Sequence, residues 1–136
     1  MKRSRLCIQA DQPLCEAEKL SRRAISLLWT DRLGWVTDRQ AHRATYAAYL
    51  DTLGWVLYRA DRREEAERVL RQAVRTAEPR PQAEILVHLG RLLSDSGDDQ
   101  EASSLAQRAL KLDPELPEAK QLLDHIRGPR PEGQAG

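Results

Sequence analysis

The sequence has no long apolar segment, few cysteines and almost no net charge. Nowhere in its 136 residues does an apolar run reach the roughly 18 residues that a transmembrane helix needs. A formal net charge of +1 creates no overall field that would attract nucleic acid or an anionic membrane. We therefore expect neither as a partner. The length is that of a single domain.

The amino-terminal residues carry no recognisable export signal. They begin with basic residues and reach Gln9, Asp11 and Gln12 before any apolar segment long enough for a signal peptide. We therefore expect a cytoplasmic location. Cys7 and Cys15 are the only cysteines, and their spacing fits no metal motif. Buried or free thiols are the expectation for both.

Residues suited to catalysis or to metal binding are sparse. The three histidines, His42, His88 and His125, have no acidic residue three or four positions later that would complete a metal pair. The seven glycines are scattered, which excludes a phosphate-binding loop. No basic stripe alternates with aromatic residues as in nucleic-acid interfaces. We expect no catalytic residue, no metal and no cofactor, and we expect that the protein is not an enzyme.

What the sequence does contain is an internal repeat. Residues 49–77 and 84–112 align at an offset of 36 residues, which places Gly54 on Gly90. Two alanines and three leucines also coincide: Ala66 with Ala102, Ala73 with Ala109, Leu50 with Leu86, Leu53 with Leu89, and Leu57 with Leu93. A fixed period of about 20–50 residues is typical of proteins built from stacked repeats.

The spacing within each copy predicts a helical hairpin. Leu50, Leu53 and Leu57 recur at intervals of three and four, so they share one helix face. Gly54 costs that helix about 1 kcal/mol relative to alanine, which suggests that another backbone passes close to it. Ala66 and Ala73 then mark the contact face of a second helix. The alternative is an ordinary bundle with two similar hairpins.

These residues resemble the tetratricopeptide repeat (TPR). The pattern of Leu50, Leu53-Gly54, Leu57, Ala66, Leu70 and Ala73 fits the first copy, and the second copy adds Ala106 and a closing Pro114. The resemblance implies an all-α fold of antiparallel helix hairpins, stacked as a short right-handed α-solenoid with a C-terminal capping helix. The sequence departs from the family pattern in two ways. Its period is 36 residues, whereas the family period is about 34. It also has Glu78 where the family usually has proline.

Three segments are expected along the chain. Residues 1–46 form a degenerate, truncated TPR-like segment with an irregular insertion, because Ala17 and Ala24 repeat the seven-residue alanine step. Its opening residues are expected to be the last turns of a first helix, followed by a complete second helix. Residues 47–127 form two repeats and the capping helix, and residues 128–136 a disordered tail. We hypothesise that the chain is a fragment or a shortened relative of a longer array, whose open amino-terminal face could self-associate.

Helix boundaries follow from caps and prolines. Thr37 or Asp38 is the expected N-cap of a long helix that runs from near Arg39 to Ala60, and Asp61 to Ala77 form the next helix. Pro81 and Pro117 are expected in first turns. We interpret Leu33-Gly34-Trp35-Val36, which repeats the letters of Leu53 to Val56, as chance or a decayed duplication. The charged face from Arg62 to Arg71 is expected to be solvated.

The candidate binding surface lies on the first helix of each repeat, which lines the concave side of such arrays. Its residues are Asp51, Trp55, Tyr58 and Arg59 on the first repeat and Glu84, Val87, Arg91 and Ser94 on the second. Large amphipathic residues such as Trp55 often anchor partner peptides. The alternative is that Trp55 packs against the preceding helix, for example against Trp29. A TPR variant that clamps a terminal carboxylate uses lysine and asparagine where this chain has Asp51 and Trp55, so a basic or apolar partner fits better.

The sequence thus predicts a scaffold that binds a protein or peptide in its concave groove. Two alternatives remain open. The chain could be the repeat region of a larger enzyme or transcription regulator, for example a glycosyltransferase-like protein, whose catalytic or DNA-binding domain is absent. It could also be a stand-alone helical enzyme.

Overall fold

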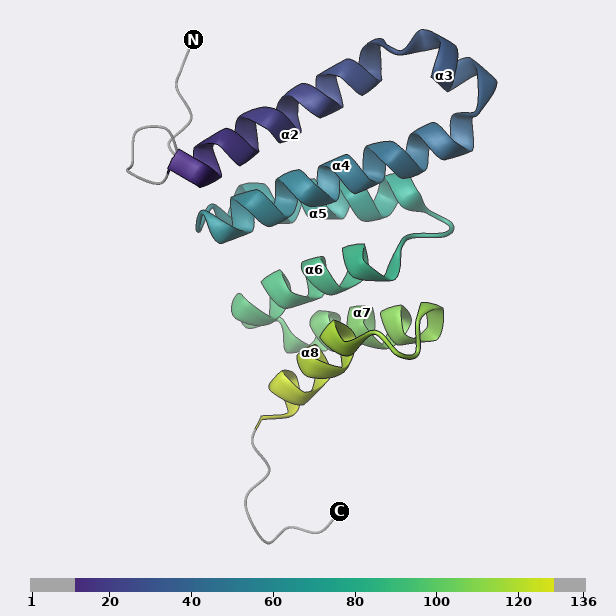
Figure 1. Cartoon of the computed structure of the whole chain (residues 1–136). Helices are drawn as coiled ribbons and strands as arrows, with labels where there is room; N and C mark the ends of the chain where they lie inside the picture. The colour runs from purple at the N-terminus through teal and green to yellow at the C-terminus, as the bar shows by residue number, and fades with distance from the viewer. Residues whose placement is uncertain (1–11, 129–136) are drawn as a thin grey trace, which may run out of the picture. The chain divides into compact units, whose positions relative to one another are not determined.

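The computed structural model describes residues 12–128 (Figure 1), and within this range every regular element is a helix. The helices fall into two compact units, which meet between Pro81 and Gln82 in the sequence. The first unit contains α2 (Gln12–Thr30), α3 (Arg32–Thr37), α4 (Arg39–Arg59) and α5 (Arg63–Ala77). The second contains α6 (Ala83–Asp95), α7 (Asp99–Leu112) and α8 (Pro117–Arg127). The expected all-α fold is therefore confirmed, and the predicted tail lies, apart from Gly128, outside the described residues.

The hairpin of α4 and α5 forms the core of the first unit. Its buried side chains are those that the repeat pattern singles out: Leu50, Leu53 and Leu57 on α4, and Ala66, Leu70 and Ala73 on α5. A Cβ added to Gly54 would lie 2.6 Å from Cγ of Leu70, so the glycine makes room for this leucine. The sequence pattern predicts that a second backbone passes close to Gly54, but the nearest atoms belong to the side chain of Leu70.

The hairpin of α6 and α7 repeats this arrangement in the second unit. Leu86, Leu89 and Leu93 of α6 are buried, and so are Ala102, Ala106 and Ala109 of α7. At Gly90 an added Cβ would lie 3.4 Å from the carbonyl oxygen of Ala102 and 2.9 Å from Cδ2 of Leu122 in α8. The small residues are thus points of close contact in both hairpins, although the nearest neighbours of the two glycines differ.

The turns inside the two hairpins have the same backbone geometry. The Arg62 amide donates to the Leu57 carbonyl at 3.0 Å, and the Asp98 amide donates to the Leu93 carbonyl at 2.9 Å. The residue before each amide has a positive φ, 62° at Asp61 and 91° at Gly97. Such a left-handed residue with a hydrogen bond back across it is a common helix C-terminal motif. The 36-residue offset therefore holds for the backbone of the turns as well as for the side chains.

Side-chain caps and prolines fix the helix starts. The Asp38 carboxylate accepts from the Ala41 amide at 3.0 Å, which identifies Asp38 as the N-cap of α4. Pro117 is the first residue of α8, as expected. Pro81 is not in a first turn, because α6 begins at Ala83 with Gln82 as its N-cap.

Helix α8 packs against α7 and α6 of its own unit. Ala119 and Leu122 are buried, and Leu123 and Ile126 are half-buried. The rest of its surface is polar and exposed: Glu118, Lys120, Gln121, Asp124, His125 and Arg127. This is the polar outer face that a terminal helix of a repeat protein needs.

Helix α2 packs along α4 and is continuous from Gln12 to Thr30. It corresponds to the complete second helix expected from the sequence, and the turns expected before it lie outside the described residues. Cys15 of α2 is 1% exposed and is disulfide-bonded, which corrects the expectation of a free or merely buried thiol. Cys7 lies outside the described residues.

The segment expected to be an irregular insertion forms an ordered corner. Trp35 of α3 stacks on Trp29 with ring centroids 5.3 Å apart, and Tyr46 of α4 meets the edge of Trp29 at 5.2 Å. His42 Nε2 lies 2.9 Å from Asp31 Oδ2. A Cβ on Gly34 would collide with the His42 ring. The Leu33-Gly34-Trp35-Val36 segment, interpreted from sequence as chance, thus supplies two residues that this corner requires.

Candidate functional site

Four of the candidate residues lie together on α4. The rings of Trp55 and Tyr58 are stacked, with centroids 5.0 Å apart and planes inclined by 25°. Both are half-buried, as is Asp51, and Arg59 is exposed. Asp51, Trp55 and Tyr58 follow each other at helical spacing along one side of α4. Trp29, the alternative packing partner considered for Trp55, instead contacts Trp35 and Tyr46.

The other four candidates lie on α6. Glu84 is exposed, Arg91 and Ser94 are half-buried, and Ser94 Oγ donates to Asp99 Oδ1 at 3.1 Å. Val87 is only 2% exposed, so it offers little surface to a partner. Glu84, Arg91 and Ser94 are therefore the members of this set that could contact one.

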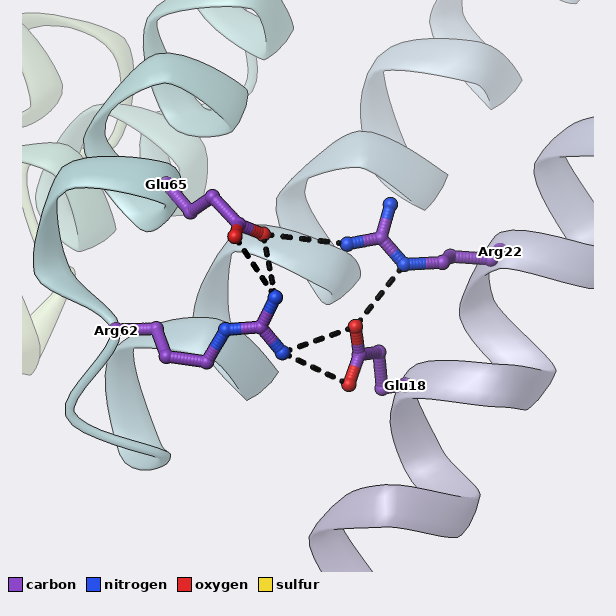
Figure 2. A network of polar contacts seen from close by, with 4 residues as sticks. All are labelled: Glu18, Arg22, Arg62 and Glu65. Carbon is purple, nitrogen blue, oxygen red and sulfur yellow. Dashed lines mark hydrogen bonds and ion pairs between the residues drawn. The ribbon is translucent and has the colours of Figure 1, made fainter. Parts of the chain in front are cut away.

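A network of four charged side chains, not predicted from the sequence, joins α2 to the first hairpin (Figure 2). Arg62 Nη1 donates to both carboxylate oxygens of Glu18 at 3.0 Å, and Arg62 Nη2 donates to both oxygens of Glu65 at 2.8 Å. Arg22 closes the ring, since its Nε donates to Glu18 at 3.1 Å and its Nη2 to Glu65 at 3.3 Å. The charges alternate in sign around this ring.

Burial makes this network more than a surface ion pair. The Glu18 side chain is 3% exposed and that of Arg62 18%, so the carboxylate must be paired to remain charged. Desolvation lowers the pKa of Arg62, but the hydrogen bonds that Arg62 donates to Glu65 and the charges of Glu18 and Glu65 outweigh it, so the pKa is raised above its ordinary value. Arg62 was expected to be solvated. It instead fixes α2 against the turn between α4 and α5.

The histidines, cysteines and acidic side chains of the described residues form no metal-binding group. His42, His88 and His125 lie on α4, α6 and α8, and residues 12–128 contain no group of three histidine, cysteine or acidic side chains placed to hold a metal ion. None of the helices described is both long and apolar enough to cross a bilayer. What the arrangement offers is surface: a stacked aromatic pair, flanking charges and polar groups.

Comparison with known protein families matches the two hairpins separately. One tetratricopeptide repeat model matches residues 47–78, and a second matches residues 85–118. A comparison with curated proteins finds no match. The two matches lie within residues 47–118, separated by residues 79–84, and coincide with the hairpins that contain Gly54 and Gly90. The chain therefore belongs to the tetratricopeptide repeat family.

Proposed function

We propose that the chain is a non-catalytic scaffold that binds a protein or peptide partner through the first helices of its two repeats, α4 and α6. Tetratricopeptide repeats support protein–protein interaction in general. The residues proposed here are Asp51, Trp55, Tyr58 and Arg59 on α4, and Glu84, Arg91 and Ser94 on α6. Val87 of α6, also a candidate from the sequence, is buried. The cytoplasm remains the predicted location.

The stacked pair of Trp55 and Tyr58 is the observation that supports this proposal most. Aromatic residues carry much of the energy of protein interfaces because they bury a large area with few rotatable bonds. Stacking fixes the orientation of both rings before a partner arrives, which lowers the entropy lost on binding. Asp51 on the same helix favours a basic or apolar segment in the partner over an acidic one.

Quantitative affinity purification tests this proposal. The wild-type chain and Trp55→Ala are compared as bait, with Leu112→Gln as a control at a leucine of α7 that is 50% exposed. We expect recovery of the specific partners to fall at least tenfold for Trp55→Ala and to be unchanged for the control. Thermal unfolding, followed by circular dichroism, shows whether both variants remain folded. An identical partner set for a Trp55→Ala variant of unchanged stability removes Trp55 from the binding surface.

The repeat region of a larger enzyme or transcription regulator stays the alternative predicted from the sequence. A neighbouring reading frame that continues the repeat and adds a catalytic or DNA-binding domain would favour it over the scaffold.

A further inference from the structure

Helix α2 presents an apolar face that its packing on α4 leaves open. Leu20 is 67% exposed and Leu27 is 60% exposed. They are seven residues apart, which places them two turns apart on one side of the helix, with half-buried Ala24 between them. The residues that α2 buries, Cys15, Glu18 and Ser21, lie on a different side, about 100–200° around the helix axis. The apolar face of α2 is therefore wider than the part that is covered.

The other second helices of the chain have their contact stripes covered. In α5 the stripe of Ala66, Leu70 and Ala73 is fully buried against α4. In α7 the stripe of Ala102, Ala106 and Ala109 is buried in the same way in the hairpin with α6. The alanine step places Ala17 and Ala24 of α2 at the corresponding positions, and both are only half-buried. Among the described residues of the first unit, 12–81, no helix covers the side of α2 that carries Leu20 and Leu27.

This open face differs from the rest of the described surface. The outer side of α8 is polar. The other exposed large apolar residues are Val36 and Leu112, which are exposed singly, and Trp29, which is 56% exposed and stacks on Trp35. Single exposed apolar residues are normal on protein surfaces, whereas a contiguous apolar stripe marks an interaction site. The stripe of Leu20, Ala24 and Leu27 has the spacing at which one amphipathic helix packs on another.

The charge beside the stripe indicates the kind of helix that fits it. Arg23 is exposed and lies three residues after Leu20 and four before Leu27, so it adjoins both leucines. It forms no ion pair with any residue in the described range. The nearby Lys19 is paired with Glu16 at 3.5 Å. A partner with a carboxylate opposite Arg23 would neutralise this charge, which has no ion-pair partner within residues 12–128.

The same arginine argues against a second copy of this chain as the occupant. In a symmetric pair each copy uses the same patch. A pairing that brings Leu20 of one copy onto Leu27 of the other is centred between Arg23 and Ala24, so it brings the two Arg23 side chains together. Like charges in an interface oppose association.

We propose that the open face of α2, formed by Leu20, Ala24 and Leu27, binds an amphipathic helix of another protein. The partner helix carries a leucine and small-residue stripe like that of α6, with an acidic residue at its edge facing Arg23. This face consists of other residues than those of α4 and α6 proposed above for scaffold function, so either proposal can fail without the other.

Two synthetic peptides test the proposal. Both copy the stripe of α6, with leucines and glycine at the spacing of Leu86, Leu89, Gly90 and Leu93, and both are stapled to hold them helical. The flanking positions are glutamate in the acidic probe and lysine in the basic probe. Binding to the full chain is measured by fluorescence anisotropy. We expect the acidic probe to bind at least tenfold more tightly than the basic probe, and Arg23→Glu to reverse this preference.

Matched variants separate binding from folding. Leu27→Gln should weaken binding of the acidic probe at least tenfold. It should not lower the melting temperature of the chain, because the side chain of Leu27 is already exposed. Leu112→Gln, at a comparably exposed leucine, should leave binding unchanged. Equal binding of both probes, or binding of neither, overturns the proposal. A dimer in light scattering that Leu27→Gln converts to a monomer also overturns it, because a second copy would then occupy the face.

Discussion

Arg62 and Glu18 are 44 residues apart in the sequence, and the guanidinium of Arg62 donates to both carboxylate oxygens of Glu18 at 3.0 Å. The carboxylate belongs to α2, whereas the arginine belongs to the turn between α4 and α5. Because Glu18 is nearly inaccessible to water, it cannot replace this partner with solvent. The pair therefore couples the position of α2 to the geometry of the first hairpin.

A double-mutant cycle measures this coupling. Glu18→Gln and Arg62→Gln should each lower the free energy of unfolding by about 1–3 kcal/mol, because each leaves a buried charged partner unsatisfied. The double variant should lose less than the sum, by about 1 kcal/mol. The measurement is urea unfolding of the full chain.

Arg63 and Asp61 provide the control for this cycle. Their side chains are 46% and 83% exposed and 3.1 Å apart, so Arg63→Gln should change stability by less than about 0.5 kcal/mol. The raised pKa of Arg62 means that its contribution is present below its unfolded pKa and is lost only in strongly alkaline solution. Strict additivity of Glu18→Gln and Arg62→Gln near neutral pH would contradict the coupling.

Each hairpin turn contains one residue with a positive φ, and substitutions at these two residues should change the free energy of unfolding in opposite directions. Asp61 has a φ of 62° in the position where the second hairpin has Gly97 with a φ of 91°. Glycine adopts this conformation without the steric cost that a Cβ brings. Asp61→Gly should therefore raise the free energy of unfolding by about 0.5 kcal/mol, whereas Gly97→Ala should lower it by about 1 kcal/mol. A thermal unfolding series on both variants decides this, and a destabilised Asp61→Gly would show that the aspartate side chain matters more than its backbone.

The start of α4 gives a prediction that distinguishes two neighbouring residues. The sequence allowed either Thr37 or Asp38 as the N-cap, and the structure places the capping hydrogen bond at Asp38. Asp38→Ala should cost about 1 kcal/mol, and Thr37→Ala, which leaves that bond intact, clearly less. Chemical denaturation of the two variants side by side tests this. A larger loss for Thr37→Ala would mean that the helix is capped differently in solution.

The residues that the sequence placed correctly are those whose position is set by local periodicity. The 36-residue offset identified Gly54 and Gly90, the leucines of α4 and α6, and the alanines of α5 and α7, because each must recur where identical hairpins close. The network of Glu18 and Arg62 could not be found in this way. Both residues lie in segments of mixed charge that look solvated, and only the packing of α2 on α4 brings them together and buries them.

The aromatic corner shows a second limit of the sequence. Trp29, Trp35 and Tyr46 are spread over three helices, and no repeat pattern relates them.

The spacing of the candidate site residues did predict that Asp51, Trp55 and Tyr58 share one side of α4. It did not predict the burial of Val87, because Val87 has the same helical phase as Asp51 but opposite polarity. Which neighbouring element covers a residue such as Val87 is decided by tertiary packing, which helical spacing does not determine.

The two helical glycines should respond differently to alanine. At Gly54 an added Cβ meets Cγ and Cδ2 of Leu70 at 2.6 and 2.7 Å, and Leu70 is fully buried. Gly54→Ala should therefore lower the free energy of unfolding by about 1–3 kcal/mol through overpacking, despite a gain in helix propensity of about 1 kcal/mol. At Gly90 the closest atom is Cδ2 of Leu122 at 2.9 Å, which is the far end of a flexible side chain and not its branch point. Gly90→Ala should cost less than Gly54→Ala. The double variant Gly54→Ala/Leu70→Ala should lose less stability than the sum of the two single variants, because alanine at position 70 leaves room for the added Cβ. Equilibrium unfolding of these variants ranks them. If Gly54→Ala were the milder change, or if the losses of Gly54→Ala and Leu70→Ala were additive, close contact with Leu70 would not be the reason for glycine at this position.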